Sequence, residues 1–330
     1  MGKTCTGVDI GESSIKLAVC EGDVVKKVVV ESLPEGLVVD GRIVSRDAMA
    51  DFIKSLAKSV GGVSKDVALV LPAADNLVRR LTLPAMTEKE LKLNLPYEFR
   101  DYIAQGKDRY LYDYAVLAMN EAPDGTPETM DLLAVASPRQ TIADFEELFR
   151  RAGLRLRVAL PEQAAFQNLI RKNPIAFQNC CVIDFSYRAT KLHFFLDGMY
   201  DVARSIEIGG MDIDRALARE RGVDEHVAVK YKLADFEDAQ HSEEVRSIYA
   251  SIAVELGRAL NFYSFNNPTT AIEVAYCCGG GALLEPLMET VDAHTNIELR
   301  PIIDLMPFTT SDRDLRALCP AAVGATRNAR

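Results

Sequence analysis

Aspartate and lysine recur in this chain at one fixed spacing, seven positions apart. Residues 9–23 read DIGESSIKLAVCEGD, and residues 184–198 read DFSYRATKLHFFLDG. Each aspartate follows an apolar, β-rich run and each lysine opens another, a pattern that predicts strand, tight turn and strand. Because the two copies stand near the beginning of each half, the repeat predicts a two-lobed chain.

The first copy of this hairpin has the side chains needed to bind phosphate. A turn of glycine and serine presents N–H groups and hydroxyls to phosphate oxygens, and glycine lets the backbone approach closely. A lysine adds a positive point charge. The candidate phosphate-binding residues are Asp9, Gly11, Ser13, Ser14 and Lys16.

The two aspartates of the repeat, Asp9 and Asp184, are candidates for holding Mg²⁺ through water, because protein-bound Mg²⁺ keeps several waters. The alternative is a pair of ordinary hairpins in which aspartate favours the turn and lysine is solvated. The equal spacing and the equivalent positions in the two halves favour the phosphate-binding interpretation.

A glycine triplet is the third candidate element. Residues 272–281, IEVAYCCGGG, predict a strand that runs into Gly279, Gly280 and Gly281, with a helical stretch directly after them. Glycines between a strand and a helix N-terminus suit the sugar or phosphate of a nucleotide. A plain tight turn is the alternative.

Bulk composition restricts the classes of partner. The chain has 38 Lys and Arg against 48 Asp and Glu, a net charge of −10, which gives no electrostatic footprint for nucleic acid. Seven cysteines form no C-x-x-C pair and are expected to be buried and reduced, as in a cytosolic protein. No apolar run approaches the roughly 18 residues of a membrane span, so no direct membrane insertion is expected.

Local signals in the sequence predict the helices and strands that surround these motifs. The apolar spacing at 46–60 predicts a helix, and another long helix is expected at about 242–264. Thr87 and Glu90 form a capping box at the start of a third helix. Residues 76–158 read β-α-β-β-α-β, the ferredoxin-like order, and are interpreted as a compact unit inserted in the first lobe.

Five segments are distinctive when taken together, namely GVDIGESSIK, LPEGLVVDGRIV, ALVLPAADNLVRRLTLPAMTEKEL, YLYDYAVLA and CCGGGALLEPL. They closely resemble the PilM family, the cytoplasmic actin-like proteins of type IV pilus assembly. The resemblance implies an α/β, actin-like (ribonuclease H-like) two-lobed fold with an inserted ferredoxin-like 1C subdomain. The implied subdomains are 1–75 with 159–172 (first-lobe core), 76–158 (1C), 173–210 with 265–330 (second-lobe core) and 211–264 (2B).

The same resemblance implies that ATP and Mg²⁺ bind between the lobes. Asp184 begins the second phosphate loop, and Gly209 and Gly210 match the family's G-G turn. Lys230 falls where the lysine of an "AE-x-x-K" helix would point toward the nucleotide. Glu255 matches a helix position that contacts ribose, although a surface ion pair with Arg258 is an equal alternative.

Two departures from the family pattern bear on hydrolysis. Phe185 and Tyr187 replace small residues in the second phosphate loop. Residues 161–165, PEQAA, exchange the glutamate and proline of the "E-P-x-A-A" crossing of hydrolytic relatives. Glu162 and Gln163 are candidates for positioning a water, although an acid at a helix N-terminus is also favourable by itself. The chain is therefore expected to be at most a weak ATPase.

The resemblance also implies partners. These are the N-terminal peptide of a PilN-like membrane protein and the pilus assembly ATPase machinery at the inner membrane, which would make the chain cytoplasmic and peripheral to that membrane. Alternatives are an FtsA-like cell-division scaffold and a small-metabolite kinase of the same superfamily. Candidates for the peptide groove are Leu91, Leu95, Tyr97 and Phe99, for which packing of their helix on its own sheet is the competing interpretation.

Overall fold

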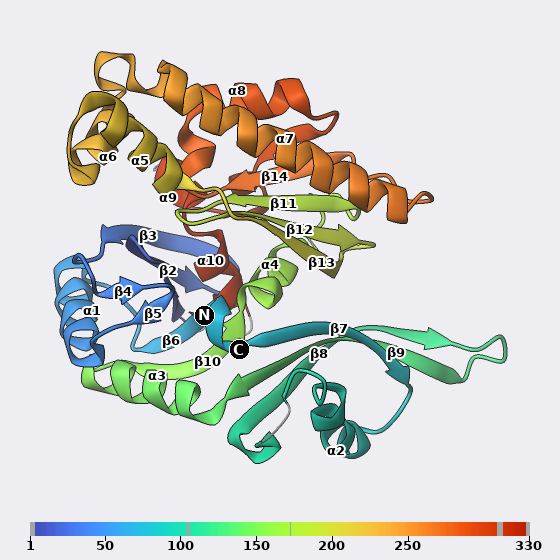
Figure 1. Cartoon of the computed structure of the whole chain (residues 1–330). Helices are drawn as coiled ribbons and strands as arrows, with labels where there is room; N and C mark the ends of the chain where they lie inside the picture. Colours follow the sequence, from blue (N-terminus) through green and yellow to red (C-terminus); the bar gives the residue numbers. More distant parts are fainter. Residues whose placement is uncertain (1–3, 104–105, 172, 309–312, 328–330) are drawn as a thin grey trace. The chain divides into compact units, whose positions relative to one another are not determined.

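The computed structural model describes residues 4–103, 106–171, 173–308 and 313–327, and these form two compact units (Figure 1). The first unit runs to Arg171 and includes residues 307–308 and 321–327. The second comprises residues 173–306 and 313–320. Each unit has its own sheet and its own apolar core.

The main sheet of the first unit has the strand order β10-β6-β1-β2-β3. The first three strands of the chain form an antiparallel meander, and the other two join it in parallel on the β1 side. Their bounds are β1 (Thr4–Ile10), β2 (Ser14–Glu21), β3 (Val24–Ser32), β6 (Asp66–Leu71) and β10 (Arg155–Pro161). A two-stranded hairpin, β4 (Val38–Val39) and β5 (Arg42–Ile43), follows the meander.

The sheet of the second unit repeats this arrangement strand for strand. Its order is β13-β12-β11-β14-β15, again three antiparallel strands extended by two parallel ones. The strands are β11 (Cys180–Phe185), β12 (Thr190–Leu196), β13 (Met199–Ile206), β14 (Val274–Cys278) and β15 (Glu298–Pro301). The duplication predicted from the Asp-x6-Lys repeat is therefore confirmed at the level of topology.

Amphipathic helices complete each core. In the first unit α1 (Arg46–Val60) buries Met49 and Ile53, as its apolar spacing predicts, and Ser45 caps its N-terminus. Helix α3 (Arg139–Arg151) packs Phe145 and Phe149 into the same core. The helices of the second unit are α5 (Gly210–Arg221), α6 (Glu225–Ala234), α7 (Glu243–Asn266), α8 (Glu285–His294) and α9 (Arg313–Ala317).

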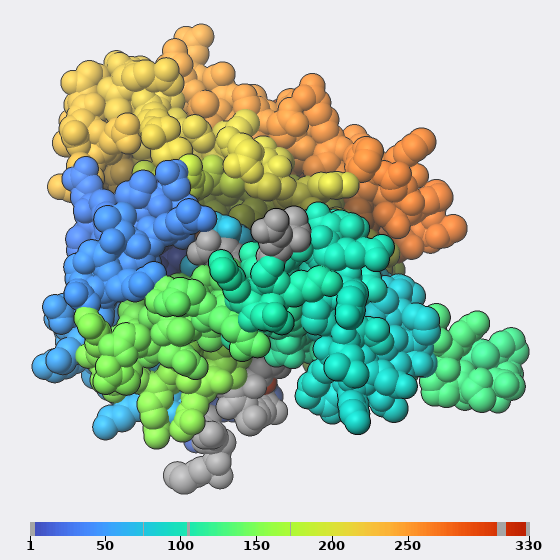
Figure 2. Space-filling view, turned by 60° about the horizontal axis from the view of Figure 1, so that its bottom comes forward, coloured from blue at the N-terminus to red at the C-terminus, as the bar shows by residue number. Residues whose placement is uncertain are grey.

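The insertion in the first unit is smaller than the sequence predicts. Its sheet has three strands, in the order β7-β9-β8, with bounds β7 (Leu77–Pro84), β8 (Tyr110–Glu121) and β9 (Pro127–Pro138). Helix α2 (Glu88–Glu98) covers this sheet with the predicted capping box and contains Pro96. Figure 2 shows the β8–β9 hairpin as a protrusion at the right edge.

The element order at 76–158 is as predicted, but assigning its last helix and strand to the insertion is wrong. Strand β10 pairs in parallel with β6 in the main sheet, and α3 packs on α1. Two arginines of β10 also form ion pairs with Asp66 at the start of β6. The physical reason is burial, because the apolar face of α3 fits the larger core, whereas α2 already covers the three-stranded sheet.

The end of the chain also departs from the prediction that residues 265–330 belong to the second lobe. Helix α10 (Pro320–Thr326) places residues 321–326 in the first unit, beside β1 and α4 (Glu162–Ile170). Small residues allow this contact. A β-carbon added to Gly7 would lie 1.8 Å from the Ala322 carbonyl oxygen, and one added to Gly324 would lie 2.1 Å from that of Ala165.

Candidate functional site

The first phosphate-loop candidate is the turn between β1 and β2. Asp9 and Lys16 are cross-strand neighbours, and the Lys16 Nζ donates to Asp9 Oδ2 at 3.2 Å. The Gly11 N–H donates to the Ser14 carbonyl at 3.0 Å and closes the turn. Both charged side chains stay about one-fifth exposed, at 22% and 19%. The carboxylate and the ammonium therefore both stay partly exposed at the turn that Gly11 closes.

The second phosphate-loop candidate has the same register, with Asp184 opposite Lys191. The Ser186 hydroxyl donates to Asp184 Oδ2 at 2.8 Å. The Phe185 side chain is 2% exposed and lies in the core of the second unit. Its ring is therefore part of the core and lies against Gly281, whereas Tyr187, the other aromatic residue of this loop, is half-buried.

The Gly209–Gly210 turn packs directly on this second loop. The Gly210 N–H donates to the Ser186 carbonyl at 3.0 Å, and the Met211 N–H donates to the Tyr187 carbonyl at 2.8 Å. A β-carbon on Gly209 would lie 2.5 Å from the Tyr187 oxygen, so only glycine permits this approach. The turn also begins α5, whose N-terminus adds a positive dipole end to the loop.

The glycine triplet lies at the same place in the second unit. Gly279 has φ +85°, and a β-carbon on it would lie 2.5 Å from Asp184 Oδ1. Gly281 packs on Phe185 in the same way. Gly280 and Gly281 open a short 3₁₀ turn (Gly280–Leu283), and α8 begins two residues after it, so the predicted order of strand, glycines and helical stretch is present, with the α-helix starting at Glu285.

A lysine that the sequence analysis missed lies at this cluster. Lys230 is exposed, whereas Lys232 Nζ would lie 3.9 Å from a β-carbon on Gly210 and pairs with Asp214 at 2.5 Å. Burial raises the pKa of Asp214, and the ammonium of Lys232 opposes that shift. Counting the "AE-x-x-K" pattern from Ala228 gives a lysine at 232, with Val229 at the glutamate position, and this spacing could have identified it.

The remaining nucleotide candidates lie on helices. Glu255 forms an ion pair with Arg258 on α7, so the surface pair that competes with a ribose contact is present. Glu162 and Gln163 are half-buried in the first turn of α4, in the first unit. Their role in positioning water stays a prediction.

The four candidates for a peptide groove separate into two groups. Leu91, Leu95 and Phe99 are at most 2% exposed and fill the core of the insertion. The prediction that these three offer surface to a partner is wrong, because α2 needs them to cover its own sheet. Tyr97 is 58% exposed on the other face of the helix, with Leu93 one turn before it.

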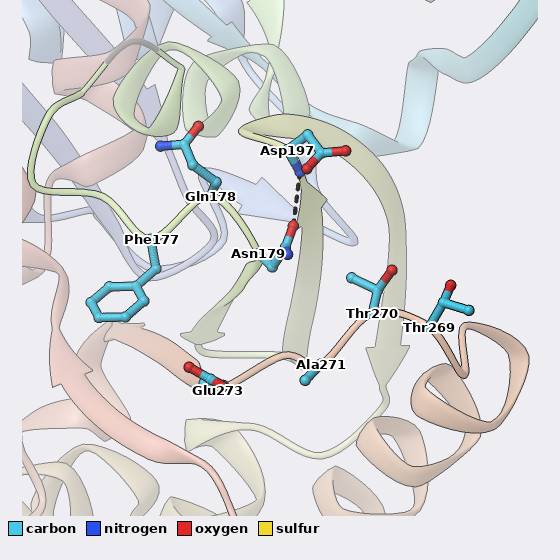
Figure 3. Close-up of a pocket in the computed structure, with 8 residues that line it drawn as sticks. All are labelled: Phe177, Gln178, Asn179, Asp197, Thr269, Thr270, Ala271 and Glu273. Carbon is cyan, nitrogen blue, oxygen red and sulfur yellow. Dashed lines mark hydrogen bonds between the residues drawn. The ribbon is translucent and has the colours of Figure 1, made fainter.

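A separate pocket of 470 Å³ opens in the second unit (Figure 3). It borders the start of β11, whereas the phosphate-loop residues follow the end of that strand. The Asp197 N–H donates to Asn179 Oδ1 at 2.9 Å on its wall. Its lining residues are Phe177, Gln178, Asn179, Asp197, Thr269, Thr270, Ala271 and Glu273. It is therefore distinct from the cluster around Asp184.

All seven cysteines are free and buried, as predicted. Within the described parts of the chain, none of the helices combines the length and apolarity required to cross a bilayer.

Comparison with known protein families decides the assignment. The family model described as type IV pilus assembly protein PilM matches residues 7–317. The chain belongs to the PilM family. A search of curated protein sequences gives no match.

Solved structures support the same fold for this PilM-family chain. A PilM–PilN type IV pilus biogenesis complex matches with a TM-score of 0.79 at 22% identity, over 99% of this chain and 98% of that one. The ethanolamine utilization protein EutJ from Carboxydothermus hydrogenoformans gives 0.63 at 15% identity, over 99% and 90%. MreB 5 of Spiroplasma citri bound to AMPPNP gives 0.53 at 14% identity, over 97% and 95%. The predicted actin-like fold is confirmed.

Proposed function

We propose that this chain is a nucleotide-binding scaffold of type IV pilus or related secretion assembly. The observation that carries the proposal is the match of the PilM family model to residues 7–317, nearly the whole chain. The duplicated sheets supply the framework, and neither an FtsA-like nor a kinase function has a comparable observation in its favour.

The proposed ligand is ATP with Mg²⁺. In the first unit Asp9, Gly11, Ser13, Ser14 and Lys16 supply a turn with backbone donors and a cation. In the second unit Asp184, Gly209, Gly210 and the Gly279–Gly281 segment gather around one loop, with Lys232 beside it. Carboxylates such as Asp9 and Asp184 suit hydrated Mg²⁺. The AMPPNP-bound MreB relative has the same fold.

The nucleotide is proposed to act as a ligand more than as a substrate. Glu162 and Gln163 remain the candidates for orienting water, and Glu255 for contacting ribose. Turnover is expected to be weak at most.

The proposed partner is the cytoplasmic N-terminal segment of a PilN-like inner-membrane protein, because the most similar fold reported above comes from a PilM–PilN complex. This partner would hold the chain at the inner membrane. Since Leu91, Leu95 and Phe99 are buried, the accessible apolar surface of α2 is Leu93 and Tyr97, and Lys107 Nζ lies 4.1 Å above the Tyr97 ring.

A peptide-binding assay tests the proposal. A labelled peptide of the PilN-like protein from the same organism is titrated with the wild-type chain, with Tyr97→Ala and with Phe265→Ala. Phe265 is an 83% exposed aromatic residue of α7 and serves as the matched control. Binding by the wild type that weakens in Tyr97→Ala alone supports the proposal. Absence of binding by the folded wild type contradicts the scaffold function, and equal binding by Tyr97→Ala contradicts the proposed surface.

A further inference from the structure

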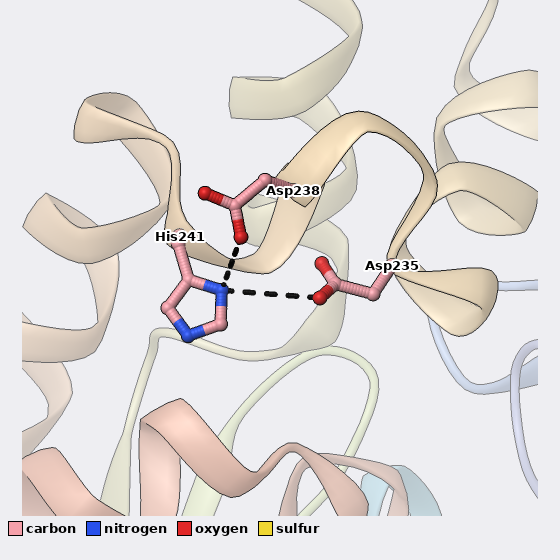
Figure 4. Close-up of side chains that lie close together, drawn as sticks. All are labelled: Asp235, Asp238 and His241. Atoms are coloured by element: carbon pink, nitrogen blue, oxygen red, sulfur yellow. Dashed lines mark ion pairs between the residues drawn. The ribbon is translucent and has the colours of Figure 1, made fainter.

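A carboxylate–imidazole cluster lies in the connection between α6 and α7, in the second unit. Asp235, Asp238 and His241 follow one another at three-residue intervals through a short 3₁₀ segment (Phe236–His241). The backbone of Asp235, Glu237 and Asp238 is left-handed, so the segment is kinked, and the three side chains lie close together in spite of the irregular backbone. Figure 4 shows the two carboxylates converging on the imidazole Nδ1.

The distances in this cluster suit a metal ion. His241 Nδ1 lies 2.8 Å from Asp238 Oδ1 and 3.9 Å from Asp235 Oδ2, and one atom from each residue lies within 4.8 Å of the others. Zinc bonds to imidazole nitrogen and carboxylate oxygen are about 2.0–2.2 Å long, so two ligands of a tetrahedral ion are about 3.3 Å apart. The two distances from His241 Nδ1 lie on either side of that value, and the ligand atoms of Asp235 and Asp238 lie within 4.8 Å of each other.

Two hydroxyls that follow the cluster in the chain, on Ser242 at the N-cap of α7 and on Tyr249 within that helix, provide a second indication. Ser242 Oγ and Tyr249 Oη are buried and have no hydrogen-bond partner among the described residues. Tyr249 is fully buried, and its pKa is raised by burial and further by the nearby Asp235 carboxylate. Buried polar atoms usually have a partner in the protein, in water or in an ion. A zinc ion with three protein ligands keeps a fourth position open for water, and that water would be a hydrogen-bond partner for such a hydroxyl.

We propose that Asp235, Asp238 and His241 bind one Zn²⁺ ion. An imidazole ligand favours zinc over Mg²⁺ and Ca²⁺, which prefer all-oxygen sites. The seven cysteines are buried, so thiolates do not compete for the added ion in the folded protein. The proposal does not depend on nucleotide binding.

The cluster is connected to the end of α6 by hydrogen bonds. The Gln240 N–H donates to Asp235 Oδ1 at 2.8 Å, and the Gln240 side-chain amide donates to the Lys232 carbonyl at 2.7 Å. A zinc ion at Asp235 therefore stiffens the segment that carries Lys232.

Calorimetric titration of the full chain with ZnCl₂ tests this site. The variants are His241→Gln and Asp238→Asn, with His294→Gln as the control. His294 is an exposed histidine of α8 whose Nδ1 lies 2.8 Å from the Thr290 carbonyl. The expected result is one Zn²⁺ per chain, bound at least about tenfold more weakly by each cluster variant and unchanged in the control, because even outer-shell changes weaken metal sites about 10–100-fold.

Visible absorption of bound Co²⁺ provides a second readout, and circular dichroism without metal establishes that each variant is folded. No saturable binding by the wild type overturns the proposal. Equal affinity in His241→Gln and Asp238→Asn, or an equal loss in His294→Gln, overturns it too.

Discussion

The buried pair formed by Lys232 and Asp214 gives the sharpest prediction about stability. The Lys232 side chain is 12% exposed and that of Asp214 is 1% exposed, and their charged atoms are 2.5 Å apart. Lys232→Met removes the cation and leaves a carboxylate buried beside apolar side chains of α5. Breaking a buried pair from one side costs about 3–5 kcal/mol of unfolding free energy.

A double substitution separates this effect from simple loss of packing. In Asp214→Leu/Lys232→Met no charge is left buried, and replacing a buried pair by apolar residues of similar size is often neutral. We therefore expect the double variant to be more stable than Lys232→Met by about 2 kcal/mol or more. Lys230→Met, at an exposed position two residues away, should change stability by no more than about 0.5 kcal/mol.

The pH dependence has a definite sign. Burial raises the pKa of Asp214 in the folded state, and Lys232 opposes the rise. Because the folded-state pKa of Asp214 is raised, its contribution to the free energy of unfolding is present below the unfolded pKa. That contribution is lost as pH rises through the folded pKa. Without the lysine the folded pKa rises further. The destabilisation of Lys232→Met should therefore be smaller at about pH 5 than at about pH 7.5.

Urea unfolding followed by circular dichroism measures these free energies. If Lys232→Met destabilises by under about 1 kcal/mol at both pH values, the ion pair is not the buried interaction described. If the double variant is no more stable than Lys232→Met, the loss comes from packing rather than from charge.

Three further predictions concern packing, thiols and capping. Gly324→Ala should destabilise by about 1–3 kcal/mol in urea unfolding, because its β-carbon would lie 2.1 Å from the Ala165 oxygen; an unchanged midpoint would contradict the packing of α10. Burial raises the pKa of Cys5 to about 11 and that of Cys180 to about 12, so a disulfide reagent at about pH 8 should react with the seven thiols slowly before unfolding and fully after it. Thr87→Ala should cost about 1 kcal/mol, since it removes the capping box with Glu90, and a loss below about 0.3 kcal/mol would argue against that cap.

The duplicated topology could be predicted from the sequence because local signals determine it. The Asp-x6-Lys repeat fixes two hairpins, and the pairing of Asp9 with Lys16 and of Asp184 with Lys191 follows from their turn lengths. The apolar period of α1 and the capping box of α2 are equally local. Each of these features is encoded within about fifteen neighbouring residues.

The predictions that proved wrong concern residues whose position is determined by long-range packing. The sequence of strand β10 fits the last strand of a ferredoxin-like unit. It joins the main sheet because the apolar side chains of this segment are buried better there, and the sequence alone does not show this. Leu91 and Phe99 could face a partner or their own sheet, and periodicity does not distinguish the two. Lys230 and Lys232 point about 200° apart around their helix. Aligning the family's lysine two positions too early therefore selects the exposed Lys230 and misses Lys232, which lies at the Gly210 turn.

Nucleotide affinity tests the central claim most directly. Calorimetry with ATP and Mg²⁺ should give saturable binding by the wild-type chain, and Asp9→Ala, in which the turn loses the carboxylate that pairs with Lys16, should lose the Mg²⁺-dependent part of that affinity. Equal affinity in Asp9→Ala, or no binding by the folded wild type, would contradict the proposal that these turns are nucleotide loops.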